Sequence, residues 1–392
     1  MRGFFPLPFD SLYSSLCGTD RWVLLDCSLQ DRTNRFSYLF TEPEQVIATR
    51  DYKEVIAALD ELDRAVSGGM WAAGAVSYEA GYGVEGKLLH LAPPQPQSPL
   101  VWFGLYRRPM VFDHRAGEWL GEKPAAADKA RKPGWWAVSG LELDADESRF
   151  SADVERVWEL IAAGRTYQVN YTRRWNFSFD GDPLEFYRAL RTAQPVPYGA
   201  MISDGDWRVL SLSPELFFRT DRSGLITTRP MKGTIGRGLD LRGDYRQAAR
   251  LRCDRKNRAE NLMIVDLLRN DLGRICRTGS VRVPDLFRVE RYRSLLQMTS
   301  TVEGQLREGA GVAEVMGKIF PSGSVTGAPK ISTMEIIAGL EDTPRGVYTR
   351  GNRLRRAGRG ELFQRGDPHG GTERRAGRAG FGLRDRGRQQ GR

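Results

Sequence analysis

Histidine and cysteine are scarce in this chain of 392 residues, and long apolar runs are absent. The three histidines all lie outside the motifs, which argues against histidine-based triads and histidine-ligated metal sites. The four cysteines show no CxxC spacing, a pattern typical of reduced thiols in a cytoplasm. No run is apolar enough to span a membrane, and two prolines and an acid make the start MRGFFPLPFD a poor signal peptide. We therefore expect a cytoplasmic protein without a membrane segment.

The positive charge of the chain is concentrated at one end. The net charge is +10, and residues 350–392 contain thirteen arginines, no lysine and four acids, a surplus of nine. The rest of the chain therefore carries about one net positive charge. Because a nucleic-acid-binding domain needs a basic surface on its folded body, this distribution does not favour nucleic acid as a partner.

Strand and helix patterns do not alternate regularly along the chain. Residues 21–120 contain short runs rich in β-branched and aromatic residues, which predict strands, with one helix at Tyr52–Val66. The polar stretch 121–134 predicts a linker or long loop. Further helices are predicted at 148–163, 254–275, near 312–318 and from PSGSVTGAPK onward.

This irregular order of elements predicts an α+β fold in which sheets are flanked by helices. We divide the chain into a β-rich N-terminal subdomain at 1–135, a catalytic domain at 136–349 and an Arg/Gly-rich tail at 350–392.

A lysine and a glutamate lie on two short extended segments. The chain reads TTRPMKGTIGRG around Lys232, and seventeen residues upstream it reads SLSPELFF around Glu215. An unprotonated lysine amine can attack an electrophilic carbon, and a protonated carboxyl can donate its proton to a departing hydroxyl. By themselves the two residues are more typical of solvated surface charges, so the pair is a hypothesis that needs support from the rest of the chain.

The predicted helix 254–275 is unusually apolar. From Leu262 to Leu268 the only polar residue is Asp266, which predicts a helix buried nearly all round. A buried Asp266 would need a partner, and Arg269 lies one turn further on, so a structural ion pair is the favoured interpretation. Glu260, at the polar start of the helix, suits a hard cation such as Mg²⁺, although a single glutamate is equally typical of a solvated acid.

The segment PSGSVTGAPK leads from a loop into a helix. Exposed N–H groups at the helix start, with Gly323 and Gly327 allowing close approach, would form an anion cradle. Pro329 suits the first helical turn. The spacing is not that of a P-loop, so ATP is not implied. A plain capped helix start explains the segment equally well.

Together these segments resemble the chorismate-binding enzymes. In the order and spacing of that family occur SLSPELFF, TTRPMKGTIGRG, KNRAENLMIVDLLRNDLGR, QMTSTVEG and PSGSVTGAPK, joined by YQVNY at 167–171 and WAAGAVSYEAGYG in the N-terminal region. The resemblance covers about residues 1–349 and implies the layered α+β fold of anthranilate synthase component I. The family includes anthranilate synthase large subunits, isochorismate and salicylate synthases, and aminodeoxychorismate synthase component I.

Two residues select a branch within that family. Lys232 stands where anthranilate synthases have Ala, which resembles the aminodeoxychorismate synthases. Gln168 stands where the isochorismate and salicylate branch carries a lysine that activates water. The resemblance therefore implies conversion of chorismate and ammonia to 4-amino-4-deoxychorismate, with ammonia released from glutamine by a glutamine amidotransferase subunit. Anthranilate synthase component I is the alternative within the family.

The resemblance also implies roles for individual residues. Lys232 would add to C2 of chorismate while Glu215 protonates the departing C4 hydroxyl, and Glu260 would bind Mg²⁺. Pro197 and Tyr198 fall where relatives bind tryptophan, and Gln297 stands where many relatives have His, which leaves that contact open. Substrate contacts are implied for Gln168, Gly233, Thr234, Ser324, Thr326 and Lys330.

The resemblance ends after GVYT at 346–349. The family continues there with Gly-Ala-Ile-Gly-Tyr, then Phe-Asn-Val-Ala-Ile-Arg-Thr, then Gly-Ile-Val-x-Asp-Ser and glutamates, none of which this chain contains. If Arg350–Leu354 is coded CGG GGC AAT CGG CTA and read on into the next codon, dropping the first base gives Gly-Ala-Ile-Gly-Tyr. The same offset recovers the other two segments from suitable codings of Phe363–His369 and Arg384–Gln389. We therefore interpret the tail as an out-of-frame translation, that is, a frameshift.

The altered tail has chemical consequences that the resemblance implies. The missing Tyr and Arg would clamp the pyruvyl carboxylate, the missing glutamates would complete the Mg²⁺ site, and the missing C-terminal strands would leave unpaired sheet edges. Five large apolar residues among 43 predict that residues 350–392 are disordered or irregular. We expect weak Mg²⁺ binding and little or no turnover of chorismate. The alternative from another class is a non-catalytic RNA-binding or interaction protein that acts through its Arg/Gly tail.

Overall fold

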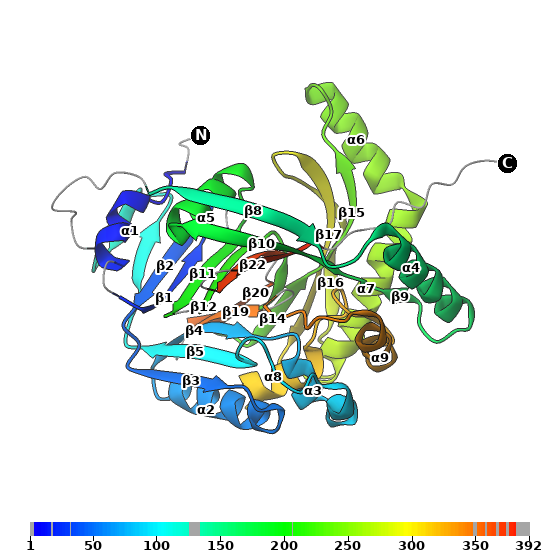
Figure 1. The fold of residues 1–392 in the computed structure, drawn as a ribbon, viewed down its shortest axis with the longest axis horizontal. Helices are drawn as coiled ribbons and strands as arrows, with labels where there is room; N and C mark the ends of the chain where they lie inside the picture. The colour runs from blue at the N-terminus through cyan, green and yellow to red at the C-terminus, as the bar shows by residue number, and fades with distance from the viewer. Residues whose placement is uncertain are drawn as a thin grey trace.

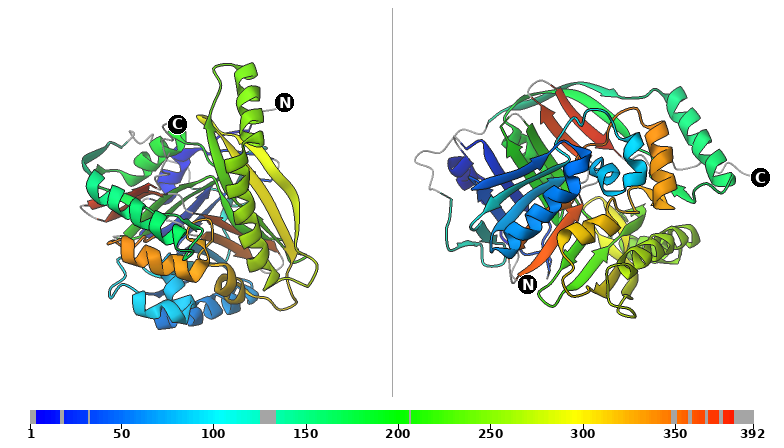
Figure 2. Two further views of the ribbon diagram at one scale, coloured as in Figure 1. Left: turned by 90° about the vertical axis from the view of Figure 1, so that its right-hand side faces the viewer. Right: turned by 90° about the horizontal axis from the view of Figure 1, so that it is seen from below.

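Two large antiparallel sheets, A and B, pack face to face in this protein (Figures 1 and 2). The computed structural model describes residues 4–16, 19–31, 33–124, 134–205 and 207–347, and the backbone of 351–356, 359–365, 368–373 and 376–381. Most of the predicted linker 121–134 lies outside these residues. The fold class predicted from the sequence is confirmed, because helices cover the outer faces of both sheets.

Within the residues that the structure describes, sheet A has ten strands. Their spatial order is β7 (Glu118–Leu120), β6 (Met110–Asp113), β2 (Phe36–Thr41), β1 (Arg21–Asp26), β11 (Tyr198–Asp204), β12 (Trp207–Ser213), β21 (Pro368–Glu373), β22 (Ala376–Phe381), β10 (Arg173–Gly181) and β8 (Trp136–Leu143).

Sheet B also has ten strands. Their spatial order is β15 (Met231–Gly236), β17 (Leu295–Gln305), β14 (Leu225–Arg229), β13 (Leu216–Thr220), β20 (Arg359–Arg365), β19 (Gly351–Arg356), β4 (Trp71–Val76), β5 (Val101–Tyr106) and β3 (Gln45–Thr49), with β16 (Arg282–Arg291) paired to β17. A small third sheet joins β9 (Gln168–Val169) to β18 (Gly327–Ala328).

The predicted helices are confirmed with shifts of a few residues at their ends. They are η1 (Tyr52–Glu54) with α2 (Val55–Ser67), α4 (Glu147–Ala162), α7 (Arg255–Gly273), α8 (Val312–Ile319) and α9 (Lys330–Leu340). Sequence patterns did not indicate α1 (Phe9–Leu16), α3 (Ala80–Val84), η2 (Gly86–Leu91), α5 (Pro183–Ala193) and α6 (Leu241–Cys253). Aspartate side chains cap the first turns of α4, α5, α6 and α7, and these are Asp146, Asp182, Asp240 and Asp254.

Three apolar layers account for the stacking of these elements. The layer between the sheets is built by inward residues of β1, β2, β11 and β12 against those of β4 and β5. A second layer lies between sheet B and the helices α2, α7 and α8, and a third joins sheet A to α1 and α5. Every residue of β4 and β5 is buried, because sheet B is covered on both faces.

The proposed boundary near residue 135 does not separate the sheets. Strands from before residue 135 pair with strands from later in the chain, as β1 does with β11. The boundary near 135 stays a prediction.

The expectation of an irregular tail without C-terminal strands is wrong for the four described segments between 351 and 381. β19 and β20 lie between β4 and β13 in sheet B, and β21 and β22 lie between β12 and β10 in sheet A. The physical reason is that strand pairing uses backbone N–H and C=O groups, which every residue except proline possesses. The flanking strands would otherwise leave these groups unpaired, so an extended segment of any composition can satisfy them. Residues 382–392 lie outside the described part of the chain.

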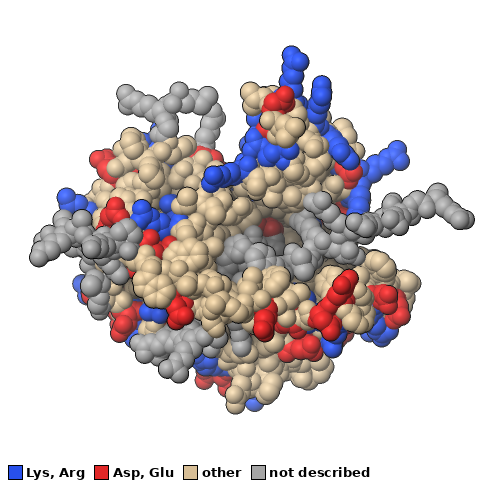
Figure 3. All heavy atoms as spheres, turned by 45° about the horizontal axis from the view of Figure 1, so that its top comes forward, with Lys and Arg blue, Asp and Glu red and all other residues tan. Residues whose placement is uncertain are grey.

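Exposed arginines line one protruding helix. α6 projects from the end of the molecule, where lysine and arginine side chains cluster in the space-filling view (Figures 1 and 3). Arg242, Arg246 and Arg250 are exposed on this helix, spaced four residues apart. No helix in the described part of the chain is long and apolar enough to cross a membrane.

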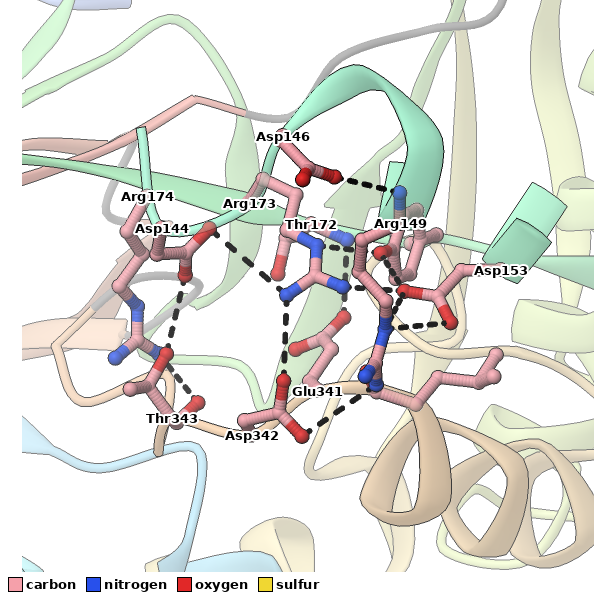
Figure 4. A network of polar contacts seen from close by, with 12 residues as sticks. Asp144, Asp146, Arg149, Asp153, Thr172, Arg173, Arg174, Glu341, Asp342 and Thr343 are labelled. Carbon is pink, nitrogen blue, oxygen red and sulfur yellow. Dashed lines mark hydrogen bonds and ion pairs between the residues drawn. The ribbon is translucent and has the colours of Figure 1, made fainter. Parts of the chain in front are cut away.

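A buried ion-pair network fixes α4 against β10 and the end of α9 (Figure 4). Arg173 pairs with Asp153, and Arg149 places its Nε 3.0 Å from the Asp153 Oδ2. Arg149 also reaches Asp342, with 3.5 Å between Nη2 and Oδ1. Burial by itself raises the pKa of Asp153, but hydrogen bonds from Tyr171, Arg149 and Arg173 outweigh burial, so the net pKa lies below its ordinary value.

We predict that this network makes stability pH-dependent through Asp153. Its folded-state pKa is depressed, so the contribution is present above the unfolded pKa of about 3.9 and is lost as pH falls through the folded value. Urea unfolding of Asp153→Asn between about pH 2 and pH 7 should therefore show a shallower loss of unfolding free energy with acid than the parent. Glu155→Gln, an exposed carboxylate of the same helix, should keep the parental slope. Equal slopes for parent and Asp153→Asn would contradict this role.

Candidate functional site

Lys232 is buried on β15, with only 9% of its surface exposed. The Asn261 Nδ2 of α7 donates a hydrogen bond to the Lys232 carbonyl at 3.4 Å, and the Ser300 Oγ donates to the Asn261 Oδ1 at 2.5 Å. Gly233 has φ +96°, and a Cβ there would lie 3.0 Å from side-chain atoms of Asn257. Glycine at this position therefore lets β15 approach α7 closely. These contacts fix the backbone on both sides of the Lys232 side chain.

Glu215 is also buried, at 8% exposure, directly before β13. The Ser324 Oγ, from the loop before α9, donates a hydrogen bond to the Glu215 Oε1 at 3.2 Å. The Ser322 and Ser324 hydroxyl oxygens are 2.9 Å apart, and the Thr326 Oγ1 donates to the Ser322 carbonyl at 3.0 Å. The structure thus brings the SLSPELFF and PSGSVTGAPK segments together around the carboxyl of Glu215.

Gln168 lies on β9, which pairs with β18 of the PSGSVTGAPK segment. The Tyr167 N–H donates to the Ala328 carbonyl at 2.7 Å, and the Asn170 N–H donates to the Thr326 carbonyl at 2.8 Å. The Gln168 Oε1 is buried and has no hydrogen-bond partner among the described residues. A buried acceptor that has no hydrogen-bond partner among the described protein groups is an expected feature of a site that receives a polar ligand.

Thr234 and Gln297 meet across β15 and β17. The Thr234 Oγ1 donates to the Gln297 Oε1 at 2.6 Å, and the two residues are register partners. Gln297, at the position where many relatives have histidine, is therefore hydrogen-bonded directly to Thr234, a predicted substrate contact.

Lys330 faces a protein carboxylate. Its Nζ lies 3.0 Å from the Asp271 Oδ2 and donates to the Lys318 carbonyl at 3.3 Å. Burial lowers the pKa of Lys330 and raises that of Asp271. This buried pair joins α7 to the start of α9. The described contacts of Lys330 are therefore with protein groups, and its predicted contact with substrate stays a prediction.

The interpretation of Asp266 as a buried carboxylate is corrected. Asp266 is exposed, with 59% of its side chain accessible, and its pair with Arg269 at 3.0 Å lies on the surface. The apolar run predicted a helix buried nearly all round, but α7 has an exposed side, and its buried carboxylate is Asp271.

The anion cradle at PSGSVTGAPK stays a prediction. Its glycines allow close approach of protein atoms, since a Cβ on Gly323 or Gly327 would meet Leu267 or the Gln168 carbonyl at 1.9 Å.

Glu260 is half-buried on α7, next to the Asn261 that holds Lys232. Among the described residues no group of three or more His, Cys, Asp or Glu side chains could hold a metal ion. Mg²⁺ is usually held by one or two carboxylates together with water and substrate oxygens. Glu260 supplies one such carboxylate, and the described residues form no group of protein ligands that would hold the ion without water and substrate oxygens.

Pro197 and Tyr198 lie where β11 begins, and both are buried. Burial raises the pKa of the Tyr198 hydroxyl, while the nearby Arg229 and Arg219 lower it. Arg229 also lies beside Glu290, with 3.6 Å between Nη1 and Oε1. The predicted tryptophan-binding position is therefore a polar, enclosed region at the junction of sheets A and B.

Sequence patterns did not indicate that Asn261 and Ser300 support the site, nor that Arg345, described below, joins its loops. Asn261 and Ser300 both lie inside motifs that carried the family resemblance, but neither type of residue marks a site by itself. A completely buried asparagine within a helix could have been suspected from its place in the apolar face that includes Ile264 and Leu268.

Comparisons with known proteins identify the family. The chorismate binding enzyme family matches residues 26–350. Aminodeoxychorismate synthase component 1 from Bacillus subtilis is 39% identical over 231 residues, which are 59% of this chain and 48% of that protein. Aminodeoxychorismate synthase from Streptomyces griseus is 38% identical over 301 residues, 70% of this chain and 41% of that protein. Anthranilate synthase component 1 from Streptomyces coelicolor is 42% identical over 220 residues, 56% of this chain and 43% of that protein.

Solved structures show the same architecture. Anthranilate synthase component I from Streptococcus pneumoniae superposes with a TM-score of 0.75 at 25% identity, covering 91% of this chain and 89% of that one. The menaquinone-specific isochorismate synthase of Escherichia coli superposes with a TM-score of 0.72 at 17% identity, covering 97% and 87%, and supports the fold alone.

The chain belongs to the chorismate binding enzyme family. It spans about half or less of the length of the curated relatives it matches first.

Proposed function

We propose that this site is that of aminodeoxychorismate synthase component I, which makes 4-amino-4-deoxychorismate from chorismate and ammonia. The observation that carries the proposal is Lys232, which is enclosed on β15 and held by Asn261 at the position that separates the branches of the family. Relatives of both the aminodeoxychorismate and the anthranilate type are about equally similar to this chain, so the amine at position 232 is what supports the aminodeoxychorismate branch.

The first step of the proposed chemistry uses two side chains together. The Lys232 amine forms a bond to C2 of chorismate as the C4 hydroxyl leaves, and Glu215 donates the proton that turns this hydroxyl into water. Ammonia then forms a bond at C4, and the bond between C2 and Lys232 breaks to release the product amine. The hydrogen bond from Ser324 orients the Glu215 carboxyl, and the unpaired Gln168 Oε1 would accept a hydrogen bond from substrate.

A glutamine amidotransferase subunit is the proposed source of ammonia. Curated relatives of this chain carry the designation component 1, which supports a second component. Glu260 is proposed as a ligand of Mg²⁺, but the incomplete ligand set predicts weak binding in the chain as it stands.

The proposal predicts the product of a direct assay. A chain with its tail restored to the family reading frame, incubated with chorismate, Mg²⁺ and an ammonium salt, should form aminodeoxychorismate, identified by liquid chromatography and mass spectrometry. Reactions without ammonium provide the control. Formation of anthranilate and pyruvate instead would assign the chain to the anthranilate synthase branch and contradict the proposal.

A further inference from the structure

Arg345 lies at the meeting point of four segments that are distant in sequence. Its side chain is only 2% exposed, and its guanidinium carbon lies 4.5 Å from the centre of the Tyr78 ring. It lies five residues after the end of α9, and the neighbouring Gly346 N–H donates to both carboxylate oxygens of Glu79 at 3.1 Å. The stretch after α9 is thereby attached to the N-terminal segment that contains Tyr78 and Glu79.

The guanidinium of Arg345 joins the two loops that carry predicted substrate contacts. Its Nη1 donates to the Val325 carbonyl at 2.7 Å, and its Nη2 donates to the Asn170 carbonyl at 2.6 Å. Val325 lies between Ser324 and Thr326, and Asn170 lies two residues after Gln168. The guanidinium of Arg345 therefore reinforces the β9–β18 pairing and helps to set the distance between the Ser324 and Gln168 loops.

Glu341 fixes the orientation of this guanidinium. The Arg345 Nε and Nη2 donate to the two Glu341 carboxylate oxygens at 2.7 and 2.6 Å. Glu341 Oε1 also accepts the Thr172 N–H at 2.9 Å, one of the contacts drawn in Figure 4. The bidentate pair leaves the other N–H groups of the planar fork directed at the loop carbonyls.

We infer that Arg345 is a positioning residue that holds the Ser324 and Gln168 loops at the spacing chorismate requires. It need not touch the substrate: it acts through the carbonyls of Val325 and Asn170. Lysine cannot take its place, because an ammonium is a point charge that cannot hold a bidentate carboxylate and two carbonyls at once. The effect on chorismate rests on the proposed function, whereas the effect on loop mobility does not.

Hydrogen exchange on the full chain tests the inference without ligand. In Arg345→Lys, peptides covering 168–172 and 322–328 should exchange about tenfold faster, the factor implied by losing one hydrogen bond to a charged group. Arg149→Lys is the matched control, because Arg149 pairs with Asp153 and Asp342 at the same end of α9 but contacts neither loop. Unchanged exchange in the two peptides, or equal acceleration along the whole chain, would overturn the inference.

A second variant and a binding measurement complete the test. If Arg345→Lys does not fold, Glu341→Gln should loosen the same two peptides by a smaller factor, because the fork loses its carboxylate but keeps its charge. In chains whose tail is restored to the family reading frame, isothermal titration with chorismate should show about tenfold weaker binding in the loosened variant than in the parent. A restored parent that binds no chorismate would contradict the proposed function alone. If a variant shows faster hydrogen exchange in the two loops but binds chorismate as tightly as the parent, the positioning role is overturned.

Discussion

Replacing Lys232 with alanine should abolish a covalent adduct and reduce product formation by at least about 10³-fold. Without ammonia, a chain restored to the family reading frame should retain chorismate carbon on Lys232, because the second step cannot release it. Peptide mass spectrometry would locate the adduct. The effect is expected to be large because the amine forms the bond that makes C4 susceptible to ammonia, and no other described lysine lies on β15.

The control for this experiment is Lys53→Ala, which removes an exposed lysine outside the site. It should leave both adduct and rate as in the parent. Thermal unfolding of the Lys232→Ala chain should stay close to that of the parent, because the Asn261 hydrogen bond uses the main-chain carbonyl. An undiminished rate in Lys232→Ala would rule out the nucleophile.

Restoring the reading frame after residue 349 should increase turnover of chorismate by about 10² or more. The family sequence supplies a Tyr and an Arg for the pyruvyl carboxylate and glutamates for Mg²⁺, whereas the present segment is rich in glycine and arginine. The strands β19 to β22 already place the described parts of this segment within both sheets. The gain should therefore come from side chains rather than from a new fold.

A paired assay of the two chains with ammonia and a titration of Mg²⁺ measures this gain. The restored chain should reach half-maximal rate at a lower Mg²⁺ concentration, because Glu260 acquires partner carboxylates. Similar circular dichroism spectra for the two chains would show that the backbone is shared. Comparable activity in both would contradict the view of the present chain as an impaired enzyme. Resequencing the gene around codon 350 would establish independently whether the shift is real.

Much of the fold followed from local patterns, and the failures have physical causes. The amphipathic helices α2 and α4 could be predicted because one side packs on the body. α6 was missed because it projects from the body and buries only Asp244 and Leu251, so its sequence lacks an apolar stripe. Asp266 was misplaced because an apolar run does not reveal which side of α7 faces sheet B.

The candidate site was predictable only through the family resemblance. Lys232 lies on β15 and Glu215 directly precedes β13, and no local pattern specifies the order of these strands in sheet B. The role of Arg345 depends on main-chain carbonyls at Val325 and Asn170, and these groups are invisible in a sequence because every residue carries them. The strands of the tail were missed for the same reason, since composition reports on side chains and pairing depends on the backbone.

The places taken by β19 to β22 have a consequence for how the protein is made. These last strands insert into the middle of both sheets, so β4 and β13 cannot be joined, nor β12 and β10, until the end of the chain has left the ribosome. A nascent chain of some 340 residues therefore exposes four strand edges in two half-built sheets. Pairings such as that of Ala75 with Asn352 join residues far apart in sequence, the kind of contact that slows folding. Errors near the C-terminus would act on solubility during synthesis as well as on catalysis.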